Sequence, residues 1–406
     1  CVFCWPDHGP TFMSTHDHSR SSGFCLVLKT EVGMSLAERL KAHIKAEGPL
    51  PLELFLDEVM TTTQDSYYAE AERFGKDGDF ITAPEISQLF GEVLAAFQAW
   101  LWELSGSPDA NEMMIFEAGP GRGTLFNDMH RSWRQICPQM AAAPVTFLET
   151  SPYLRSVLTS RFSGLDIHLA KTADNLPEVP LFGVANEFFD ALAIRQAIKR
   201  DQGWVWRAIG LDIDQFVFCD GPALHPDEMR QHKLAADAPA DSVAEFSPAS
   251  EAVLARLARH VARFGGSVLI CDYGKANRQD DSLQAVRAHK AVPVLDMLGL
   301  SDISHLVDFA ALARCAEAQG ARLVGPVEQS RFLSELGIEK RAEALRRKDD
   351  PERDRVLSAA LDRLCAPQHM GELFKIALLV PAGEGLPAGF ASLRETGLQP
   401  KERRGG

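Results

Sequence analysis

The sequence predicts an α/β fold built on a mainly parallel, Rossmann-like sheet. Beyond about residue 110, short apolar segments alternate with segments of helical periodicity. This alternation indicates a parallel sheet that is covered by helices on both faces. One apolar segment, residues 113–118, passes through a glycine-rich turn into a helix-like segment that begins near Thr124. A turn of this kind directs free N–H groups and the positive end of a helix dipole to the region above the sheet.

Residues 34–110 are predicted to form a helical N-terminal subdomain. One helix begins at Ser35 and is ended by Gly48 and Pro49, and a second begins near Pro51. A longer helix is expected over residues 85–104, where apolar residues recur on one side.

Seven strands are expected for the central sheet in the rest of the chain. They cover residues 113–118, 145–149, 165–169, 181–186, 267–273, 322–327 and the segment "FKIALLVP". The first six belong to a core over residues 111–330. A charged helical segment and the last strand form an addition over residues 331–385.

An insertion is predicted at about residues 200–250, between the fourth and fifth strands. Its segments "WVWRAIGL" and "QFVFCD" alternate like a β-hairpin, and a polar stretch follows them. Insertions at the ligand edge of a sheet commonly cover the site. Residues 1–33 have no strong period and are expected to be a disordered extension, and residues 386–406 a loose tail.

Composition narrows the class of protein. The chain has 406 residues, 46% of them hydrophobic and 24% charged, with a net charge of −14. This negative net charge argues against a nucleic-acid partner, because proteins bind nucleic-acid phosphates with a basic surface. No apolar run approaches the roughly 18 to 20 residues of a membrane span. We therefore expect a soluble protein without nucleic-acid or membrane partners, and the composition leaves a homodimer open.

The eight cysteines are scattered along the whole length rather than grouped as in a disulfide scaffold. Reduced thiols are the expected state. Cysteine and histidine residues crowd positions 1–25, but only one C-x-x-C is present and no second pair follows at a finger-like spacing. No metal site is expected.

The glycine turn is the first candidate site. It reads E-x-G-x-G-x-G, from Glu117 through Gly119 and Gly121 to Gly123. A dinucleotide fingerprint needs G-x-G-x-x-G, and the third glycine here comes one position early, while Pro120 removes a donor from the loop. The observed spacing is instead the pattern associated with S-adenosylmethionine. Its glycines let the methionine part and the ribose lie against the backbone, and the strand-end carboxylate accepts the ligand's ammonium.

A second carboxylate, Glu149, follows the second predicted strand in "VTFLETSP". It is a candidate acceptor for the ribose hydroxyls of the ligand. A dinucleotide site also needs an acid at this position, so the residue supports a nucleoside ligand without separating the two classes. The alternative role is an N-terminal cap for the helix that begins at Ser151 and Pro152.

The fourth predicted strand ends in "VANEFFDALAI", which places Asn186, Glu187 and Asp190 at the crevice edge of the sheet. Methyl transfer is an in-line displacement, and the protein must align the acceptor atom. Paired carboxylates bind a guanidinium through charge-assisted hydrogen bonds, so these residues are the candidate catalytic group. The alternative is that the acids only stabilise the first turn of a following helix.

Eight segments in order now resemble a known family. They are "FGKDGDFITAPEISQLFGE", "FEAGPGRGTL", "LETSPYLR", "ANEFFDALAIRQ", "LICDYG", "DISHLVDF", "QSRFLSELGI" and "MGELFKIALL". Together they closely resemble the MidA-like proteins over about residues 35–383. These are class I S-adenosylmethionine-dependent methyltransferases, and they include the mitochondrial complex I assembly factor that acts as a protein arginine methyltransferase.

The resemblance implies a seven-stranded methyltransferase fold with helical additions and S-adenosylmethionine as cofactor. It implies ω-N methylation of an arginine in the 49-kDa-type iron–sulfur subunit of NADH:quinone oxidoreductase, in support of complex I assembly. The compartment would be the cytoplasm of a bacterium or the mitochondrial matrix of a eukaryote. It also marks a characteristic stretch beside the site as substrate-binding, here Asp79, Phe80, Thr82, Ala83, Pro84 and Glu85.

This chain departs from the family pattern at two places. Ala193 stands where a proline is usual after the N-E-x-x-D-A box, and the histidine expected just before Val307 is at His305 instead. Two other functions stay open from the sequence. One is an assembly chaperone that binds the cofactor without turnover, and the other is a methyltransferase for a different nitrogen or oxygen acceptor. A nicotinamide oxidoreductase is disfavoured by the glycine spacing.

Overall fold

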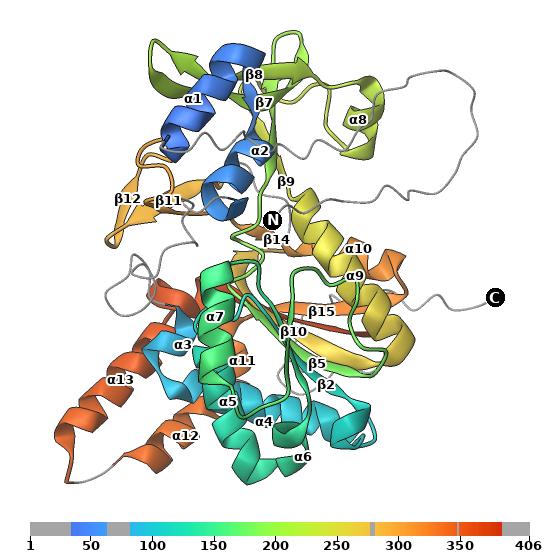
Figure 1. Ribbon diagram of the computed structural model, residues 1–406, viewed down its shortest axis with the longest axis vertical. Helices are drawn as coiled ribbons and strands as arrows, with labels where there is room; N and C mark the ends of the chain where they lie inside the picture. The colour runs from blue at the N-terminus through green and yellow to red at the C-terminus, as the bar shows by residue number, and fades with distance from the viewer. Residues whose placement is uncertain (1–33, 63–81, 277–280, 347–348, 384–406) are drawn as a thin grey trace.

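The computed structural model describes residues 34–62, 82–276, 281–346 and 349–383. Its centre is a sheet whose main path runs β4-β3-β2-β5-β10-β16-β15 (Figure 1). These strands are β2 (Met114–Ala118), β3 (Val145–Leu148), β4 (Ile167–Ala170), β5 (Leu181–Asn186), β10 (Gly266–Lys275), β15 (Ala321–Glu328) and β16 (Phe374–Pro381). All seven predicted strands are confirmed, and no end differs from its predicted position by more than two residues.

The sheet is mainly parallel, as predicted. β2 lies between β3 and β5 and is parallel to both, with Ile115 opposite Val145 on one side and Phe182 on the other. β16 runs antiparallel to both of its neighbours, β10 and β15. The short β14 (Val307–Asp308) pairs with the end of β10. The chain leaves β2 in one direction for β3 and β4 and returns to β5 on the other side, so the strand order reverses at β2.

Alternate strand residues face two separate cores, because successive side chains of a strand point to opposite faces of a sheet. Ile115 packs in the core formed with α4 (Gln88–Leu104) and α5 (Thr124–Ile136). Met114 and Phe116 pack in the other core, under α9 (Pro248–Phe264) and α10 (Phe309–Ala318). Both faces of the sheet are therefore covered.

A cluster of phenylalanines packs α5 onto the sheet just after the glycine turn. Phe126 meets Phe147 of β3 and Phe162 edge-on, with ring centroids 5.1 and 5.0 Å apart. Such pairs contribute about 0.5–1.5 kcal/mol beyond the area they bury. Their packing holds the first turn of α5, and with it the glycine turn, in one position.

The single long helix predicted over residues 85–104 is wrong at its start. The structure has a short α3 (Ala83–Ile86) and then α4, separated by Ser87 in an extended conformation (φ −163°, ψ 141°). The Ser87 hydroxyl accepts a hydrogen bond from the Leu89 N–H at 3.2 Å and so caps α4. Apolar periodicity continued across the break, but serine is favoured at an N-cap, where its side chain satisfies a free N–H.

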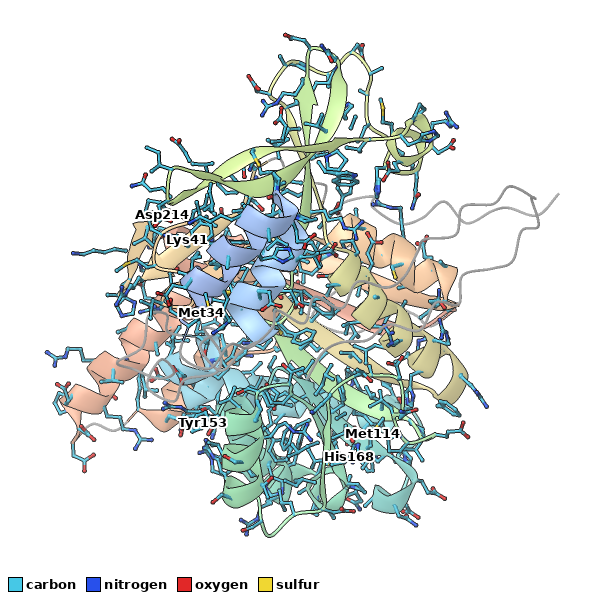
Figure 2. All side chains as sticks on the ribbon, turned by 45° about the horizontal axis from the view of Figure 1, so that its top comes forward. Met34, Lys41, Met114, Tyr153, His168 and Asp214 are labelled. Atoms are coloured by element: carbon cyan, nitrogen blue, oxygen red, sulfur yellow. The ribbon has the colours of Figure 1, made fainter. Side chains whose placement is uncertain are left out.

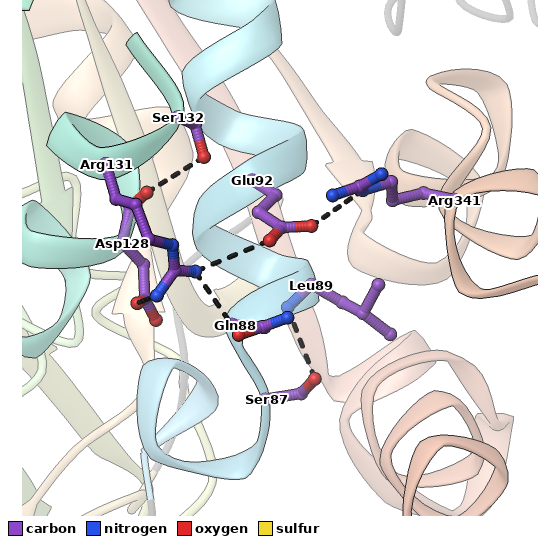
Figure 3. A network of polar contacts seen from close by, with 8 residues as sticks. All are labelled: Ser87, Gln88, Leu89, Glu92, Asp128, Arg131, Ser132 and Arg341. Carbon is purple, nitrogen blue, oxygen red and sulfur yellow. Dashed lines mark hydrogen bonds and ion pairs between the residues drawn. The ribbon is translucent and has the colours of Figure 1, made fainter. Parts of the chain in front are cut away.

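Ion pairs link α4 to its neighbours (Figure 3). The Glu92 carboxylate lies between Arg131 of α5, at 3.4 Å, and Arg341 of α12 (Ile338–Leu345), at 2.7 Å. Arg131 also pairs with Asp128 at 3.0 Å. Both arginines are exposed, so these pairs contribute little stability. The pair of Arg341 with Glu92 joins α12, in the C-terminal addition, to α4.

A second module lies at the other end of the molecule (Figure 1). It is a five-stranded sheet of β1 (Leu50–Pro51), β6 (Arg195–Arg200), β7 (Gly203–Asp212), β8 (Gln215–Ala223) and β9 (Val243–Phe246). β7 and β8 form the predicted hairpin. β1, from the N-terminal part of the chain, extends the sheet by pairing with β7, which the sequence pattern of the insertion did not indicate.

The first two helices, α1 (Leu36–Glu47) and α2 (Leu52–Asp57), pack on this module rather than on the central sheet. The Lys41 ammonium pairs with Asp214, in the turn between β7 and β8, at 2.6 Å (Figure 2). The described parts of residues 34–110, which are 34–62 and 82–110, are thus shared between the two ends of the molecule. A small three-stranded sheet, which was not predicted, packs in the same apolar core as α1 and α2. It consists of β11 (Gln284–Arg287), β12 (Lys290–Val292) and β13 (Asp302–Ser304).

The remaining helical segments are η1 (Glu58–Thr62), η4 (Ala110–Glu112), α6 (Pro138–Ala142), α7 (Pro152–Arg161), α8 (Pro226–Gln231), α11 (Gln329–Glu335), α13 (Pro351–Cys365) and η5 (Pro367–Gly371). Among the helices of the described ranges, none combines the length and the apolar character needed to cross a membrane.

Candidate active site

A cavity of about 790 Å³ lies at the carboxyl ends of β2, β3 and β5. This is the edge where the strand order reverses, and ligands of open α/β sheets bind at such points. One part of the cavity is lined by the glycine turn and the ends of β2 and β3. The other is lined by the turn after β5, by α2 and by the small sheet. The cavity therefore contains both the predicted cofactor residues and the predicted catalytic residues, and it extends to the second module.

The three glycines of the turn all have positive φ angles, of 63° at Gly119, 54° at Gly121 and 75° at Gly123. A Cβ atom at Gly119 would lie 2.9 Å from the Phe188 ring, and one at Gly123 would lie 2.5 Å from the Phe162 ring. At Gly121 a Cβ atom would meet nothing within 4 Å, because this residue faces the cavity. Two glycines are therefore needed for packing, and Gly121 for access to the cavity.

Glu117, at the end of β2, is buried beneath this turn and lines the cavity. Burial raises the pKa of Glu117 to about 8, and Arg161 opposes the shift. Burying a carboxylate is costly unless a partner compensates it. A cationic group in the cavity, such as the ammonium of an amino acid, would restore the ionised form.

Glu149 follows β3 and also lines the cavity. Its carboxylate accepts a hydrogen bond from the Ser151 N–H at 2.8 Å. Burial raises the pKa of Glu149 to about 7, against the hydrogen bonds from the backbone. The cap of α7 itself is the Ser151 hydroxyl, which accepts from the Leu154 N–H at 3.3 Å. The helix cap therefore does not require Glu149, and its carboxylate is available at the cavity.

The buried carboxyls predict a stability that depends on pH. Between pH 4.5, the ordinary Glu value, and about 8, the folded state keeps a proton on Glu117 that the unfolded chain has released. The free energy of unfolding must then fall as pH rises through this window. We expect the melting temperature of the cofactor-free protein to fall from pH 5 to pH 8, and less steeply in Glu117→Gln. Calorimetry over this range measures it, and equal slopes in both proteins would contradict it.

The turn after β5 brings Asn186, Glu187 and Asp190 together at the cavity, as predicted. Glu187 has a left-handed backbone, with φ 49°. Its Oε1 atom accepts hydrogen bonds from the Ala83 N–H at 3.0 Å and from the Asn186 amide at 3.1 Å. Burial raises the pKa of Glu187 to about 8. This carboxyl group thus also holds the N-terminus of α3.

Two oxygen atoms beside Glu187 are left without partners. Asn186 Oδ1 and Asp190 Oδ1 are buried and accept no hydrogen bond from the described residues. Burial, together with the nearby Asp272 and Glu187 carboxyls, raises the pKa of Asp190 well above its usual range, and Tyr273 opposes this shift. No helix begins at Asp190, so the alternative role in a first helical turn is wrong. A buried oxygen that accepts no hydrogen bond from the protein is free to accept one from a ligand or a water molecule.

Other elements complete this half of the cavity. Tyr273, on β10, donates a hydrogen bond to Ser304 of β13 and accepts one from Gln284 of β11 at 3.3 Å. Asp302 also lines the wall, and α2 adds Glu53 and Asp57 at the rim. These residues had no predicted role. The segments "LICDYG" and "DISHLVDF" contain three of them, but their spacing gave no sign that they meet.

The predicted substrate stretch is described in part. Thr82, Pro84 and Glu85 line the cavity, while Asp79 and Phe80 lie outside the described residues. His305 is buried away from this cavity, with its ring nitrogens against the carbonyl oxygens of Leu192 and Leu306, and burial lowers the pKa of His305 to about 4. Its contacts are those of a structural residue.

The fold and the site together define a class I methyltransferase that uses S-adenosyl-L-methionine. A family model described as "Putative S-adenosyl-L-methionine-dependent methyltransferase" matches residues 93–327, and the chain belongs to this family. Among curated relatives, the protein arginine methyltransferase NDUFAF7, mitochondrial, of Rattus norvegicus is 32% identical over 383 residues. That match covers 85% of this chain and 84% of the relative.

Further comparisons agree with this membership. The protein of the same name from Homo sapiens is 32% identical, over 85% of this chain and 83% of the relative. A crystal structure of a Burkholderia thailandensis protein bound to S-adenosyl-homocysteine is 27% identical with a TM-score of 0.76. It covers 88% of this chain and 94% of that chain. Fold class and cofactor are thus confirmed.

Proposed function

We propose that this enzyme methylates an arginine side chain of a protein. The observation that carries the proposal is the pair of partnerless buried oxygens, Asn186 Oδ1 and Asp190 Oδ1, beside the Glu187 carboxyl group. A guanidinium presents five N–H donors in a planar fork and no acceptor. It would satisfy both oxygens and offset the burial of the two acids.

The residues of the site fit S-adenosyl-L-methionine. The Gly121 backbone leaves open space at the cavity, and Glu117 is a buried acid that a ligand ammonium would compensate. When bound, the cofactor supplies an electrophilic methyl group on a positively charged sulfur. Glu117, Gly121 and Glu149 would hold it at the end of the cavity formed by β2 and β3.

Glu187 and Asp190 would then orient the acceptor. Charge-assisted hydrogen bonds from the guanidinium to these carboxylates fix the direction of its nitrogen lone pair. As the carbon–sulfur bond breaks and the carbon–nitrogen bond forms, the bonding pair stays on sulfur and the nitrogen loses a proton. Asp190, which lines the cavity, has an oxygen without a hydrogen-bond partner and has a raised pKa, is placed to receive that proton.

The protein acceptor is inferred from similarity. The curated relatives are named protein arginine methyltransferases, and the resemblance to MidA-like proteins points to the 49-kDa-type subunit of complex I and a role in its assembly. By the same similarity the site of action is the mitochondrial matrix in a eukaryote or the cytoplasm in a bacterium. Asp79, Phe80, Thr82, Pro84 and Glu85 would contact the protein substrate.

Mass spectrometry of complex I tests this proposal. Peptides of the purified complex from cells with and without the protein should differ by a methylated arginine in the 49-kDa-type subunit. Purified enzyme and radiolabelled cofactor should restore the mark on subunit from the deficient cells. Identical arginine modification in both cell types would remove this substrate from the proposal. Label recovered on another amino acid would identify a different acceptor.

A further inference from the structure

The turn after β5, which carries Glu187 and Asp190, is held in place by a side chain that lies outside the cavity. Asp272, on β10, is fully buried and does not line the cavity. Its Oδ2 atom accepts hydrogen bonds from three successive backbone N–H groups, those of Phe188, Phe189 and Asp190, at 3.2, 2.9 and 3.4 Å. Its Oδ1 atom accepts from the N–H of Tyr273 at 3.0 Å.

The N–H groups of the turn are thereby all directed at β10. The Glu187 N–H donates to the carbonyl oxygen of Cys271 at 2.8 Å, and the next three donate to Asp272. Three successive N–H groups around one carboxylate oxygen form a concave anion site. A buried N–H without a partner costs free energy comparable to a lost hydrogen bond. The conformation of the turn therefore depends on the Asp272 carboxylate.

The turn also contains a conformation that needs support. Glu187 has φ 49°, and a left-handed backbone at a residue other than glycine costs of order 1–3 kcal/mol unless its surroundings impose it. The contacts to β10 lie on both sides of this residue. They impose the conformation that carries the Glu187 side chain to Ala83 and the cavity.

We propose that Asp272 is a positioning residue for the acceptor site, because its carboxylate fixes the turn that presents Glu187 and Asp190 to the cavity. The inference rests on the proposed function, since it concerns the residues that would hold the methyl acceptor. It assigns to "LICDYG" a role in methyl transfer that is separate from cofactor binding.

Asp272→Asn in the full chain tests this role. Both carboxylate oxygens of Asp272 accept from backbone N–H groups, so the NH₂ group of asparagine would face such donors in either orientation of its amide. The variant therefore loses hydrogen bonds to the backbone and the negative charge. We expect methyl transfer to fall on the order of tenfold or more, while affinity for S-adenosyl-homocysteine changes far less. Glu245→Gln is the control, because Glu245 is also a buried carboxylate that accepts a backbone N–H, from Ser282 at 3.0 Å, away from this cavity. It should match the variant in melting temperature and retain activity.

The assay follows radiolabel from the cofactor into proteins of an extract prepared from cells that lack the enzyme. Amino-acid analysis of the labelled product tests the proposed function, because label outside arginine would overturn it. The ratio of Asp272→Asn to wild-type transfer tests Asp272 with any acceptor. Equal transfer, or a loss of activity no larger than the loss of folded protein, would overturn the positioning role.

Hydrogen exchange of the wild-type protein supplies a measurement that does not depend on how the variant folds. The amides of Phe188, Phe189 and Asp190 should be strongly protected, because all three donate to one buried carboxylate. In folded Asp272→Asn their exchange should be faster than in Glu245→Gln. Wild-type exchange as rapid as in an unstructured peptide would contradict the inference.

Discussion

Glu187→Gln is expected to retain the cofactor and lose most methyl transfer, by a factor on the order of 10 to 1000. Glutamine keeps an oxygen that can accept from the Ala83 N–H and the Asn186 amide, the two hydrogen bonds made by Glu187 Oε1. It replaces the other oxygen with an NH₂ group and removes the charge. Charge-assisted hydrogen bonds are roughly twice as strong as neutral ones, and this range corresponds to about 1.4–4 kcal/mol of transition-state stabilisation.

The measurement is steady-state transfer to a recombinant arginine-containing client, with a cofactor titration for each variant. Glu58→Gln is the control, because Glu58 is a buried acid whose pKa burial raises to about 7, yet it does not line the cavity. It should keep wild-type turnover. Equal turnover in Glu187→Gln and wild type would exclude Glu187 from the mechanism, whereas weakened cofactor binding would assign it to the cofactor site.

Gly121→Val is expected to abolish cofactor binding and leave the fold largely intact. The backbone of Gly121 has φ 54°, which strains any side chain, and a Cβ atom there would project into open space at the cavity. The branched valine side chain would take up the volume that the ligand needs. At Gly123, by contrast, any side chain would collide with Phe162, so a variant there would combine loss of packing with loss of binding.

Gly106→Val provides the matched control for backbone strain. Gly106 also has a positive φ, 87°, a Cβ atom there would meet nothing within 4 Å, and the residue lies at the exposed end of α4. Both variants should lose a similar amount of stability. Only Gly121→Val should fail to bind S-adenosyl-homocysteine in calorimetry. Wild-type affinity in Gly121→Val would place the cofactor elsewhere.

Tertiary pairing explains the parts of the fold that sequence patterns did not predict. The small sheet depends on contacts of β11 with β13, in which Ala285 lies opposite Ile303. β1 has only two residues, and it is a strand because Leu50 pairs with Ile209 of β7. Such short segments have no usable period of their own. Their extended conformation is imposed by pairing with strands that are distant in the sequence.

The site shows the same division. The amino-acid order alone placed Glu117, Gly121, Glu149 and the residues of "ANEFFD" at strand ends, because a parallel sheet brings the carboxyl ends of its strands to one edge. It could not place Asp272 beneath that turn. The hydrogen bond from Phe188 to Asp272 spans 84 positions, and the one from Ala83 to Glu187 spans 104.

Local periodicity reports which face of a strand or helix is buried, and spacing within a turn reports which backbone conformations it allows. Both are properties of neighbours along the chain, so the sequence by itself determined the strand–helix order, the glycine turn and the cofactor class. The acceptor half of the cavity was decided only by tertiary structure. There Tyr273, Ser304 and Asp190 meet from separate elements, because hydrogen-bond partners are selected by the packing of the sheet and the second module.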